Sequence, residues 1–419
     1  MLKRLFAATF RMKRETLNCV CILVIASVTL SSCTDVSDKA LRIQASSNIE
    51  VAKNPFLDFL KDQQEAELGL SKIPGAVTHI VKDSETYFQH LYGAKDVQSC
   101  QPVTENTLFR MGSLSKGFTG ILAAKLHEKG IIDLEKPVVE YLPCLSQSNN
   151  EEVRQIKLYH LLSHSAGIVP HAYTLDIEAG VLPIDLCPKY EKLISVGQLG
   201  THFYQNAFFA LIEDIVEQQT GKVFSQVMIE ELFDPLDICS VAFDHESYIE
   251  SQDYAAPHRW SSSKKEYVKV PFKKKYFNAV SAGGICMSSS DMGKWMDALL
   301  GNRKDVISEK VLALAFEKHT DTRNDPRNVN KWSGVDSVHY GLGWRLVDYK
   351  GKQLIYHAGY VDAFRSEILI DPKEKLGIFA VLNCANSYAG RVIPSLLQSL
   401  ESEEEIRAPG WEVTLACSS

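Results

Sequence analysis

Hydrophobic and polar residues alternate with a period of two at both ends of the chain. Residues 76–92 alternate around the polar segment Lys82–Glu85, which predicts a β-hairpin. Near the other end, the turn-like segment Asp371–Gly377 separates two apolar runs. Three strands are predicted there: Leu354–His357, Phe364–Ile370 and Ile378–Leu382.

A helical period dominates the residues between these two regions. Apolar residues recur every three or four positions in Leu114–Gly130, in Phe208–Gly221 and in Asp291–Leu300. About two hundred central residues are therefore expected to be mostly helical. The pattern predicts an α+β fold, in which an antiparallel sheet flanked by terminal helices carries a large helical insertion.

These elements suggest how the chain is organised. Residues 56–400 are expected to form one folded unit, with the sheet part at about 56–150 and 335–400 and the helical part at about 151–334. Before this unit lie an expected signal peptide at 1–32 and a polar tether at 33–55. Residues 401–419 contain three consecutive glutamates and are predicted to be a loose tail.

The N-terminal segment predicts export and lipid anchoring. Lys13 and Arg14 precede the apolar stretch Cys19–Leu30, which is too short to span a bilayer. The following Leu30–Cys33 resembles the lipobox of bacterial lipoproteins, which implies cleavage before Cys33 and its acylation. We therefore expect a lipid-anchored membrane lipoprotein that faces the periplasm. Translation starts at Met1 or at Met12, and Thr34 after the lipidated cysteine suggests sorting to the outer membrane in a Gram-negative cell.

Composition excludes some classes of protein. The chain has 419 residues, 45% of them apolar and 23% charged, so it can bury a large core. A net charge of −7 argues against a nucleic-acid binder, because neutralising phosphates requires a concentrated basic surface. The basic run Lys273–Lys275 is typical of a solvated loop.

Cysteines give no sign of a catalytic thiol. Seven remain after Cys33, so at least one is unpaired within a monomer, and the pairing cannot be deduced from sequence. Cys286 and Cys384 lie in apolar runs and are predicted to be buried. The seven are Cys100, Cys144, Cys187, Cys239, Cys286, Cys384 and Cys417.

Candidate chemistry begins with Ser113 and Lys116. Residues three apart share a helix face, so the ammonium would lie beside the hydroxyl. A serine hydroxyl needs such a neighbour to take its proton during attack on a carbonyl. By itself this spacing also fits an N-cap serine followed by an exposed lysine. Farther along, Tyr204 and Asn206 precede a helix, and Gly359 ends a strand where a backbone would approach a ligand closely.

Together these segments resemble a known family. Ser113–Lys116, Tyr204–Asn206 and His357–Gly359 are similar to the three ordered motifs of the serine β-lactamase and penicillin-binding-protein superfamily. Further segments resemble its class C β-lactamase branch, and the likeness spans about residues 56–400. These segments are Leu161–Gly167, Ala282–Gly284, Asp291–Trp295, Tyr340–Trp344 and Asn383–Tyr388. The resemblance implies the same α+β fold, with a cleft where the three motifs meet.

The resemblance also implies a role for each motif residue. Ser113 would form the acyl-enzyme, while Lys116 and Tyr204 share the proton transfers, in an order that the sequence leaves open. Asn206 would bind a substrate amide and help to hold Lys116. The backbone N–H groups of Ser113 and Tyr360 would bind the oxyanion. No metal or organic cofactor is implied.

One departure from the class C pattern concerns substrate binding. His357–Gly359 replaces the Lys-Thr-Gly of those enzymes, so a permanent charge and a hydroxyl that grip a substrate carboxylate are absent. Family members with His-x-Gly include peptidases and esterases. Arg365 is a candidate for the missing cation, although an exposed strand arginine also simply keeps a sheet soluble.

Two other groupings have structural explanations. His160 and His164 have the spacing of zinc ligands on one helix face, but no third ligand is near in sequence, and a structural helix end is favoured. Ser281 resembles the serine of a nucleophile elbow, but the preceding strand is poorly supported. We interpret that segment as a glycine loop that leads into the helix Asp291–Leu300.

The expected function is therefore a serine hydrolase that acts on a β-lactam or on a D-amino-acid-containing amide. A D-alanyl-D-alanine carboxypeptidase or an esterase with the same machinery is the first alternative. A non-catalytic cell-wall-binding lipoprotein is the second. The expected partners are a small-molecule or peptide substrate and the membrane through the lipid anchor, and the protein is expected to be a monomer.

Overall fold

The computed structural model describes residues 54–147, 151–190, 198–323, 325 and 328–407. The predicted signal peptide, the lipidation site Cys33 and nearly all of the tether lie outside these residues. No helix of the described part is both long enough and apolar enough to cross a membrane.

A nine-stranded sheet forms the scaffold of the described residues, in the order β3-β2-β1-β14-β13-β12-β11-β10-β9, and its paired strands are antiparallel. The predicted hairpin and the predicted C-terminal strands are all present in this sheet. Its strands are β1 (Gly75–Lys82), β2 (Glu85–Asp96), β3 (Gln101–Pro102), β9 (Thr320–Asp321), β10 (Val335–Tyr340), β11 (Arg345–Tyr349), β12 (Lys352–Val361), β13 (Phe364–Asp371) and β14 (Leu376–Leu382).

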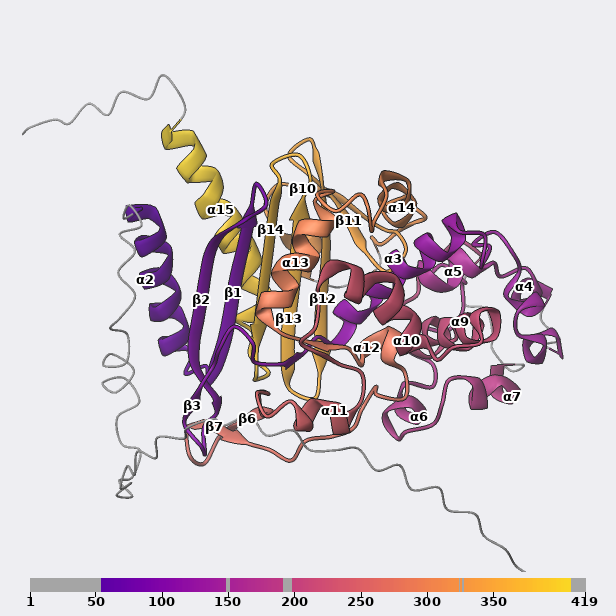
Figure 1. The fold of residues 1–419 in the computed structure, drawn as a ribbon, viewed down its shortest axis with the longest axis horizontal. Helices are drawn as coiled ribbons and strands as arrows, with labels where there is room; N and C mark the ends of the chain where they lie inside the picture. Colours follow the sequence, from indigo (N-terminus) through magenta and orange to yellow (C-terminus); the bar gives the residue numbers. More distant parts are fainter. Residues whose placement is uncertain (1–53, 148–150, 191–197, 324, 326–327, 408–419) are drawn as a thin grey trace, which may run out of the picture. The chain divides into compact units, whose positions relative to one another are not determined.

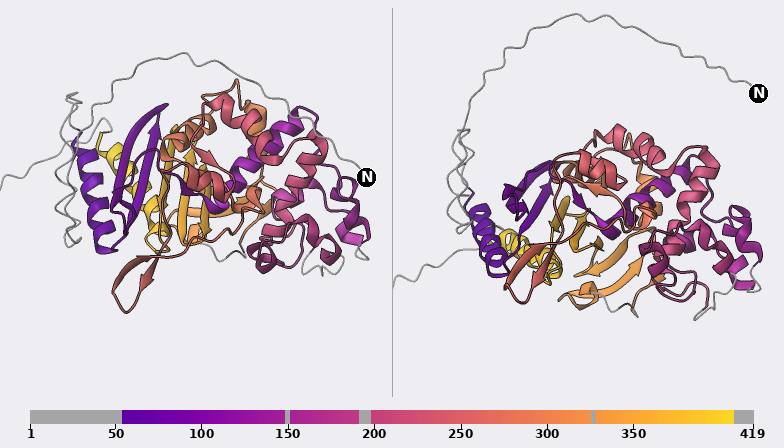
Figure 2. Two further views of the ribbon diagram at one scale, coloured as in Figure 1. Left: turned by 60° about the horizontal axis from the view of Figure 1, so that its bottom comes forward. Right: turned by 90° about the horizontal axis from the view of Figure 1, so that it is seen from below.

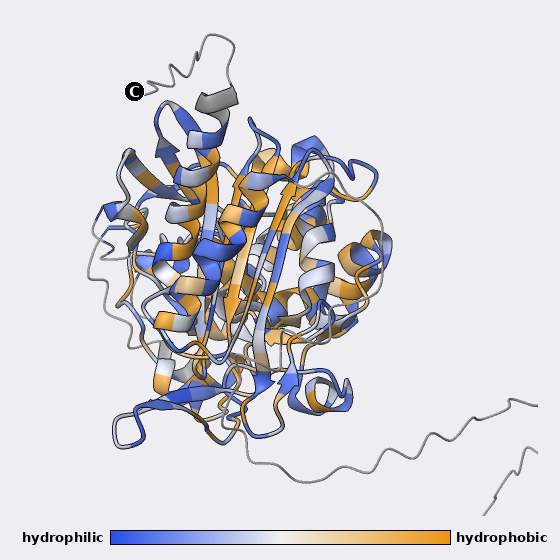
Figure 3. Cartoon of the chain, turned by 90° about the vertical axis from the view of Figure 1, so that its left-hand side faces the viewer, coloured by the Kyte–Doolittle hydropathy of each residue, from blue (hydrophilic) through white to orange (hydrophobic). Residues whose placement is uncertain are grey.

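Helices cover both faces of this sheet, which explains why a central strand such as β14 is apolar and buried at every position. On one face, α2 (Pro55–Leu70) and α15 (Ala389–Arg407) pack against a cluster that includes Leu369 and Ile378. On the other face, α13 (Ser289–Leu299) packs Met296 against β14. Figure 1 shows this layering, and Figure 3 shows apolar strands beneath the helices.

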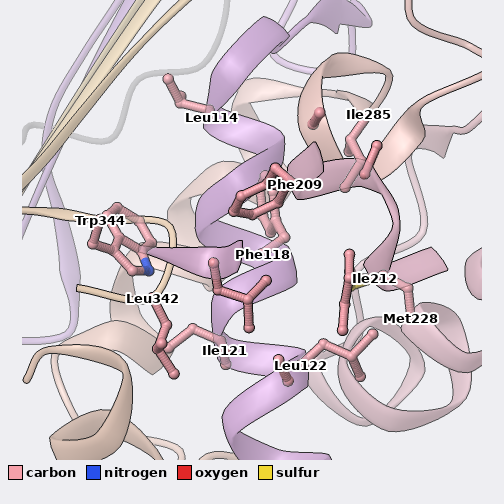
Figure 4. Close-up of a cluster of buried hydrophobic side chains, with 14 of the residues drawn as sticks. Leu114, Phe118, Ile121, Leu122, Phe209, Ile212, Met228, Ile285, Leu342 and Trp344 are labelled. Atoms are coloured by element: carbon pink, nitrogen blue, oxygen red, sulfur yellow. The ribbon is translucent and has the colours of Figure 1, made fainter. Parts of the chain in front are cut away.

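The helical part is built around α3 (Ser115–Glu128), which is buried almost along its whole length. Phe118 packs against Trp295 at 4.6 Å between ring centroids, and Figure 4 shows the surrounding cluster. The other helices here are α4 (Glu151–Arg154), α5 (Leu158–Leu162), α6 (Thr174–Glu178), α7 (Cys187–Tyr190), α8 (Asn206–Ala210), α9 (Ile212–Thr220), α10 (Phe224–Met228), α11 (His245–Glu250), α12 (Val280–Gly283) and α14 (Glu309–Ala315). Short helical turns lie between them: η3 (Val138–Glu140), η4 (Pro143–Gln147), η5 (Ile184–Leu186), η6 (Ile229–Phe233), η7 (Asp234–Leu236) and η8 (Asn328–Lys331).

The central region is less uniformly helical than predicted. It contains the hairpin of β6 (His258–Ser261) and β7 (Glu266–Lys269), which projects from the sheet part in Figure 2. Trp260 lies opposite Tyr267 across this hairpin, a cross-strand aromatic pair that stabilises strand pairing. A small sheet, β4-β8-β5, joins β4 (Phe109–Arg110), β8 (Cys286–Met287) and β5 (Val241–Ala242).

The predicted loose tail begins later than expected. Helix α15 continues past residue 400 to Arg407, since side chains of its last turns bond to the sheet part. Glu401 accepts hydrogen bonds from Tyr349 and Lys350, and Glu403 accepts one from Tyr87. The prediction was wrong for residues 401–407, which continue the helix and are held to the sheet part by these contacts.

One disulfide is present among the described cysteines, between Cys144 and Cys187. It links η4 to α7, 43 residues apart in sequence. Cys286 and Cys384 are buried, as their apolar surroundings predict. Burial raises the pKa of each thiol to about 12, so neither is a reactive thiolate at neutral pH.

Candidate active site

Ser113 lies in η2 (Gly112–Leu114), the helical turn that leads directly into α3. Gly112 has a φ of +53°, and the Tyr360 backbone nitrogen lies 2.9 Å from where its Cβ would be. Glycine is therefore required at position 112 for two independent reasons. The tight turn leaves Ser113 half-buried at the head of the helix.

Lys116 follows one turn later and is fully buried. Its Nζ lies 3.4 Å from Ser113 Oγ, as the three-residue spacing predicts. The same Nζ donates to Asn206 Oδ1 at 2.8 Å and to the Ala282 carbonyl at 2.6 Å. These acceptors compensate a buried ammonium for the water that it has lost.

Tyr204 closes the site above the lysine. Lys116 Nζ lies 4.9 Å from the centroid of the Tyr204 ring, and the side chain of Tyr204 is almost completely buried. The ring of His164 packs against that of Tyr204, with 4.1 Å between the ring centroids. The chain thus brings the hydroxyl, the amine and the phenol ring together from two segments about ninety residues apart.

Asn206 is the first residue of α8, and Tyr204 lies in the preceding loop. While Asn206 Oδ1 faces Lys116, its Nδ2 donates to the hydroxyl of Tyr276 at 2.9 Å. Tyr276 is buried and was missed by the sequence analysis, because it lies in a loop without a recognisable motif. A signal that could have identified Tyr276 is its position directly after the lysine run and close to Ala282–Gly284.

Strand β12 carries the third motif, in the part of the strand that β11 does not pair with. Strand β11 pairs with it only from Lys352 to Tyr356, so the next residues of β12 have no β11 partner. Gly359 and Tyr360 lie within β12, whereas the sequence predicts that Gly359 ends a strand. The backbone nitrogen of Tyr360 lies beside Gly112, the residue before Ser113.

At Gly359 the backbone of β12 approaches another part of the protein closely. A Cβ there would overlap the Met111 carbonyl oxygen and Ser366 Oγ, which are themselves hydrogen-bonded at 2.6 Å. Glycine therefore lets β12 lie flat against the segment that carries Ser113.

His357 is fully buried and does not project into solvent. Its Nε2 hydrogen-bonds with the Tyr340 hydroxyl at 2.7 Å, and its Nδ1 with the Ala358 carbonyl at 3.0 Å. Arg365 pairs with Tyr360 across the sheet and stacks on that ring at 4.6 Å. Strand alternation puts this pair on the face opposite Gly359 and Ser366, so Arg365 is not directed toward Ser113.

The two histidines with zinc spacing serve other purposes. His160 Nδ1 hydrogen-bonds with the Lys157 backbone N–H at 3.0 Å at the start of α5, and His164 packs on Tyr204. Burial lowers the pKa of His160 to about 4. Among the described residues, no group of three histidine, cysteine or acidic side chains is placed to hold a metal ion.

Comparisons with known proteins show the family of this chain. The family model described as Beta-lactamase matches residues 62–398. The chain is 28% identical over 344 residues to an unguisins hydrolase of Aspergillus campestris, which covers 77% of this chain and 61% of that protein. It is 24% identical over 345 residues to protein flp of Staphylococcus aureus, covering 81% and 64% of the two chains. It thus spans less than two thirds of either relative.

Two further comparisons cover about three quarters of the matched protein. A β-lactamase of Escherichia coli is 27% identical over 312 residues, or 74% of this chain and 76% of that one. The octameric penicillin-binding protein homologue of Pyrococcus abyssi superposes with a TM-score of 0.71 at 22% identity. That superposition covers 81% of this chain and 77% of the other, and it supports a shared fold.

Proposed function

This chain belongs to the Beta-lactamase family, and from that premise we propose that it is a serine hydrolase that forms an acyl-enzyme through Ser113. One observation carries the proposal. Lys116 Nζ lies 3.4 Å from Ser113 Oγ inside a buried site that also contains the Tyr204 ring. A nucleophile within reach of a proton acceptor is the arrangement that acyl transfer requires.

In the proposed reaction, Ser113 Oγ attacks a carbonyl carbon, and its proton passes to Lys116 or Tyr204. The carbonyl oxygen becomes an oxyanion that the backbone N–H groups of Ser113 and Tyr360 bind. The bond to the leaving nitrogen or oxygen then breaks as that atom takes up the proton. Water attacks the resulting ester in a second cycle, which releases the acid and restores the serine hydroxyl.

The buried ammonium must lose a proton before it acts as a base. It keeps Asn206 and Ala282 as acceptors for its remaining hydrogens, so the neutral amine stays oriented toward Ser113. Burial itself favours the neutral form of a lysine, since it removes the water that solvates the charge.

A β-lactam or a D-amino-acid-containing amide is the proposed substrate, by analogy with the family. The relatives carry different names, among them β-lactamase and unguisins hydrolase, so the family alone does not fix the substrate.

An esterase or a carboxypeptidase is the second candidate, and His357 favours the esterase. Both of its ring nitrogens are engaged, one by Tyr340 and one by the Ala358 carbonyl. Ala358 offers no hydroxyl, so this strand contributes no side-chain contact of the class C kind to a substrate carboxylate. An uncharged leaving group, such as a simple alcohol, needs no such contact.

Covalent labelling tests the proposal directly. Full-length protein in detergent is incubated with a fluorescent fluorophosphonate and, separately, with a fluorescent penicillin, and the labelled peptide is identified by mass spectrometry. We expect the label on Ser113, its loss in Ser113→Ala and its retention in Ser115→Ala. An unlabelled wild-type protein that also fails to hydrolyse a chromogenic cephalosporin, a D-alanyl peptide and a nitrophenyl ester would instead support the cell-wall-binding alternative.

The same experiment separates the candidate substrates. A β-lactamase releases the penicilloyl group quickly, whereas a penicillin-binding carboxypeptidase retains it. Rapid ester hydrolysis without penicillin labelling would identify an esterase.

We also propose that Cys33 carries the lipid anchor and that the enzyme faces the periplasm as a monomer. The support is the signal-like segment before Cys33. Metabolic labelling with a fatty-acid analogue should mark the wild type and not Cys33→Ala. Light scattering of the detergent-solubilised protein gives the oligomeric state, and an octamer would contradict the monomer.

A further inference from the structure

The Ala282 carbonyl that binds Lys116 belongs to a very short helix. Helix α12 spans only Val280–Gly283 and has no side-chain hydrogen bond at its N-cap. A single helical turn is not stable by itself, so its position must be set by tertiary contacts. Whatever fixes α12 therefore also fixes the acceptor that lies 2.6 Å from Lys116 Nζ.

Glu213 makes two of these contacts. It lies in the first turn of α9, and its Oε1 accepts from the backbone N–H of Ser281 at 2.7 Å and from Ser281 Oγ at 2.6 Å. A carboxylate that accepts two hydrogen bonds from one residue fixes both the backbone and the side chain of that residue.

A second contact completes the link to the catalytic helix. Thr119 Oγ1, on α3, donates to the Ser281 carbonyl at 3.0 Å. Ser281 is therefore held from one side by α9 and from the other by α3, and its neighbour Ala282 faces Lys116. The sequence pattern around Ser281 predicts only a glycine loop, whereas the structure has the short helix α12 there.

The environment of Glu213 gives this contact a pH dependence. Burial, the largest effect, raises the pKa of Glu213 to about 7, while the two hydrogen bonds from Ser281 act in the opposite direction. Asp214 and Glu217, on the same helix, raise it further through charge repulsion. The carboxyl group thus changes its charge near neutral pH.

We propose that Glu213 is a positioning residue, which holds the Ala282 carbonyl against Lys116 and thereby sets the reactivity of that lysine toward Ser113. This inference rests on the proposed function. If α12 shifted, the ammonium would lose one acceptor, and its hydrogen bond to the serine hydroxyl would change in length and direction. The contact acts through α12, and Glu213 itself touches neither substrate nor nucleophile.

Three variants test the proposal. Glu213→Ala removes the acceptor, whereas Glu213→Gln keeps an oxygen that accepts both bonds but removes the charge. Glu217→Gln is the matched control on the same helix, because Glu217 Oε1 accepts instead from the backbone N–H of Phe224 at 3.0 Å. If Glu213→Ala does not fold, Ser281→Ala replaces it, since this change removes one of the two bonds and leaves the backbone intact.

The measurement is the rate constant for fluorophosphonate labelling of Ser113, followed from pH 5 to 10 and corrected for the folded fraction. At pH 7 we expect the labelling rate constant of Glu213→Ala to be at least about tenfold lower than that of the wild type, with a displaced pH profile. Glu213→Gln should react within about threefold of wild type but lose the inflection near neutral pH. Glu217→Gln should match the wild-type rate at neutral pH, but with the inflection moved to lower pH, because this change removes a charge that raises the pKa of Glu213. Amide hydrogen exchange should rise in residues 280–283 of Glu213→Ala only.

Each contrary result has a definite meaning. If folded Glu213→Ala labels at the wild-type rate with the wild-type pH profile, its role is structural and the inference is wrong. Unchanged hydrogen exchange in α12 would also overturn it. If wild-type Ser113 is not labelled at all, the proposed function fails and this inference fails with it, whereas labelled wild type with unaffected variants refutes only the inference.

Discussion

Replacing Tyr276 with phenylalanine should damage the site through Asn206. The Tyr276 hydroxyl accepts from Asn206 Nδ2 at 2.9 Å, and this bond keeps Asn206 Oδ1 turned toward Lys116. Without the hydroxyl, the Asn206 amide loses a hydrogen bond that favours this orientation. A flipped amide would present its N–H₂ group to an ammonium, where neither partner can accept a hydrogen bond.

The size of the effect follows from burial. Tyr276 and Asn206 are both buried, so the lost acceptor leaves a donor unsatisfied, which costs about 1–3 kcal/mol. If the whole cost appears in the transition state, kcat/KM falls about 5- to 150-fold, since 1.36 kcal/mol corresponds to a factor of ten. If it appears only in the folded ground state, the melting temperature falls by about 2–4 °C per kcal/mol at most.

Two assays distinguish these outcomes. The labelling rate of Ser113 and the calorimetric melting temperature are measured for Tyr276→Phe and for the control Tyr141→Phe. Tyr141 is equally buried, but its hydroxyl accepts from the Asp133 backbone N–H at 2.7 Å. We expect a lower melting temperature in both variants and a lower labelling rate of Ser113 only in Tyr276→Phe. Equal labelling rates in the two variants would refute the reasoning.

Three further predictions follow from other parts of the structure. Lys116→Met keeps the length of the side chain but removes the proton acceptor, and the labelling rate of Ser113 should fall by about 10²- to 10⁴-fold. Gly359→Ala drives a Cβ into the Met111 carbonyl and should destabilise the fold by about 1–3 kcal/mol in urea unfolding. Burial raises the pKa of Glu367 from 4.5 to about 8, so its contribution to stability is complete below pH 4.5 and is lost as the pH rises to about 8. Glu367→Gln should reduce the slope of the unfolding free energy against pH over that range by up to about 1.4 kcal/mol per pH unit.

The sequence predicted well those features that depend on local patterns. Alternation located the hairpin of β1 and β2 and the strands at the C-terminal end, because one residue step in a strand reverses the exposed face. The Ser113 and Lys116 pair was predictable for the same reason, since helical geometry alone places them side by side.

Other features could not be predicted because long-range contacts decide them. The hairpin of β6 and β7 lies in a region where the overall pattern favours helix, and residues 401–407 are helical although they are polar and acidic. The closeness of Gly359 to Met111 is also a tertiary fact. The glycine was noticed in the sequence, but its neighbour is another strand end of the same chain.

The residues that support Lys116 show why a motif gives only part of a site. The lysine, Asn206 and Ala282 all lie in segments that the family resemblance identifies, whereas Tyr276 and Glu213 do not. The motif residues are those that the proposed reaction uses directly. Residues that only hold them in place come from other segments of the chain, so they form no local pattern in one sequence. Their geometry is nevertheless specific, because a buried ammonium tolerates no missing acceptor. Substitutions at Tyr276 and Glu213 should therefore change reactivity while the recognisable motifs stay intact.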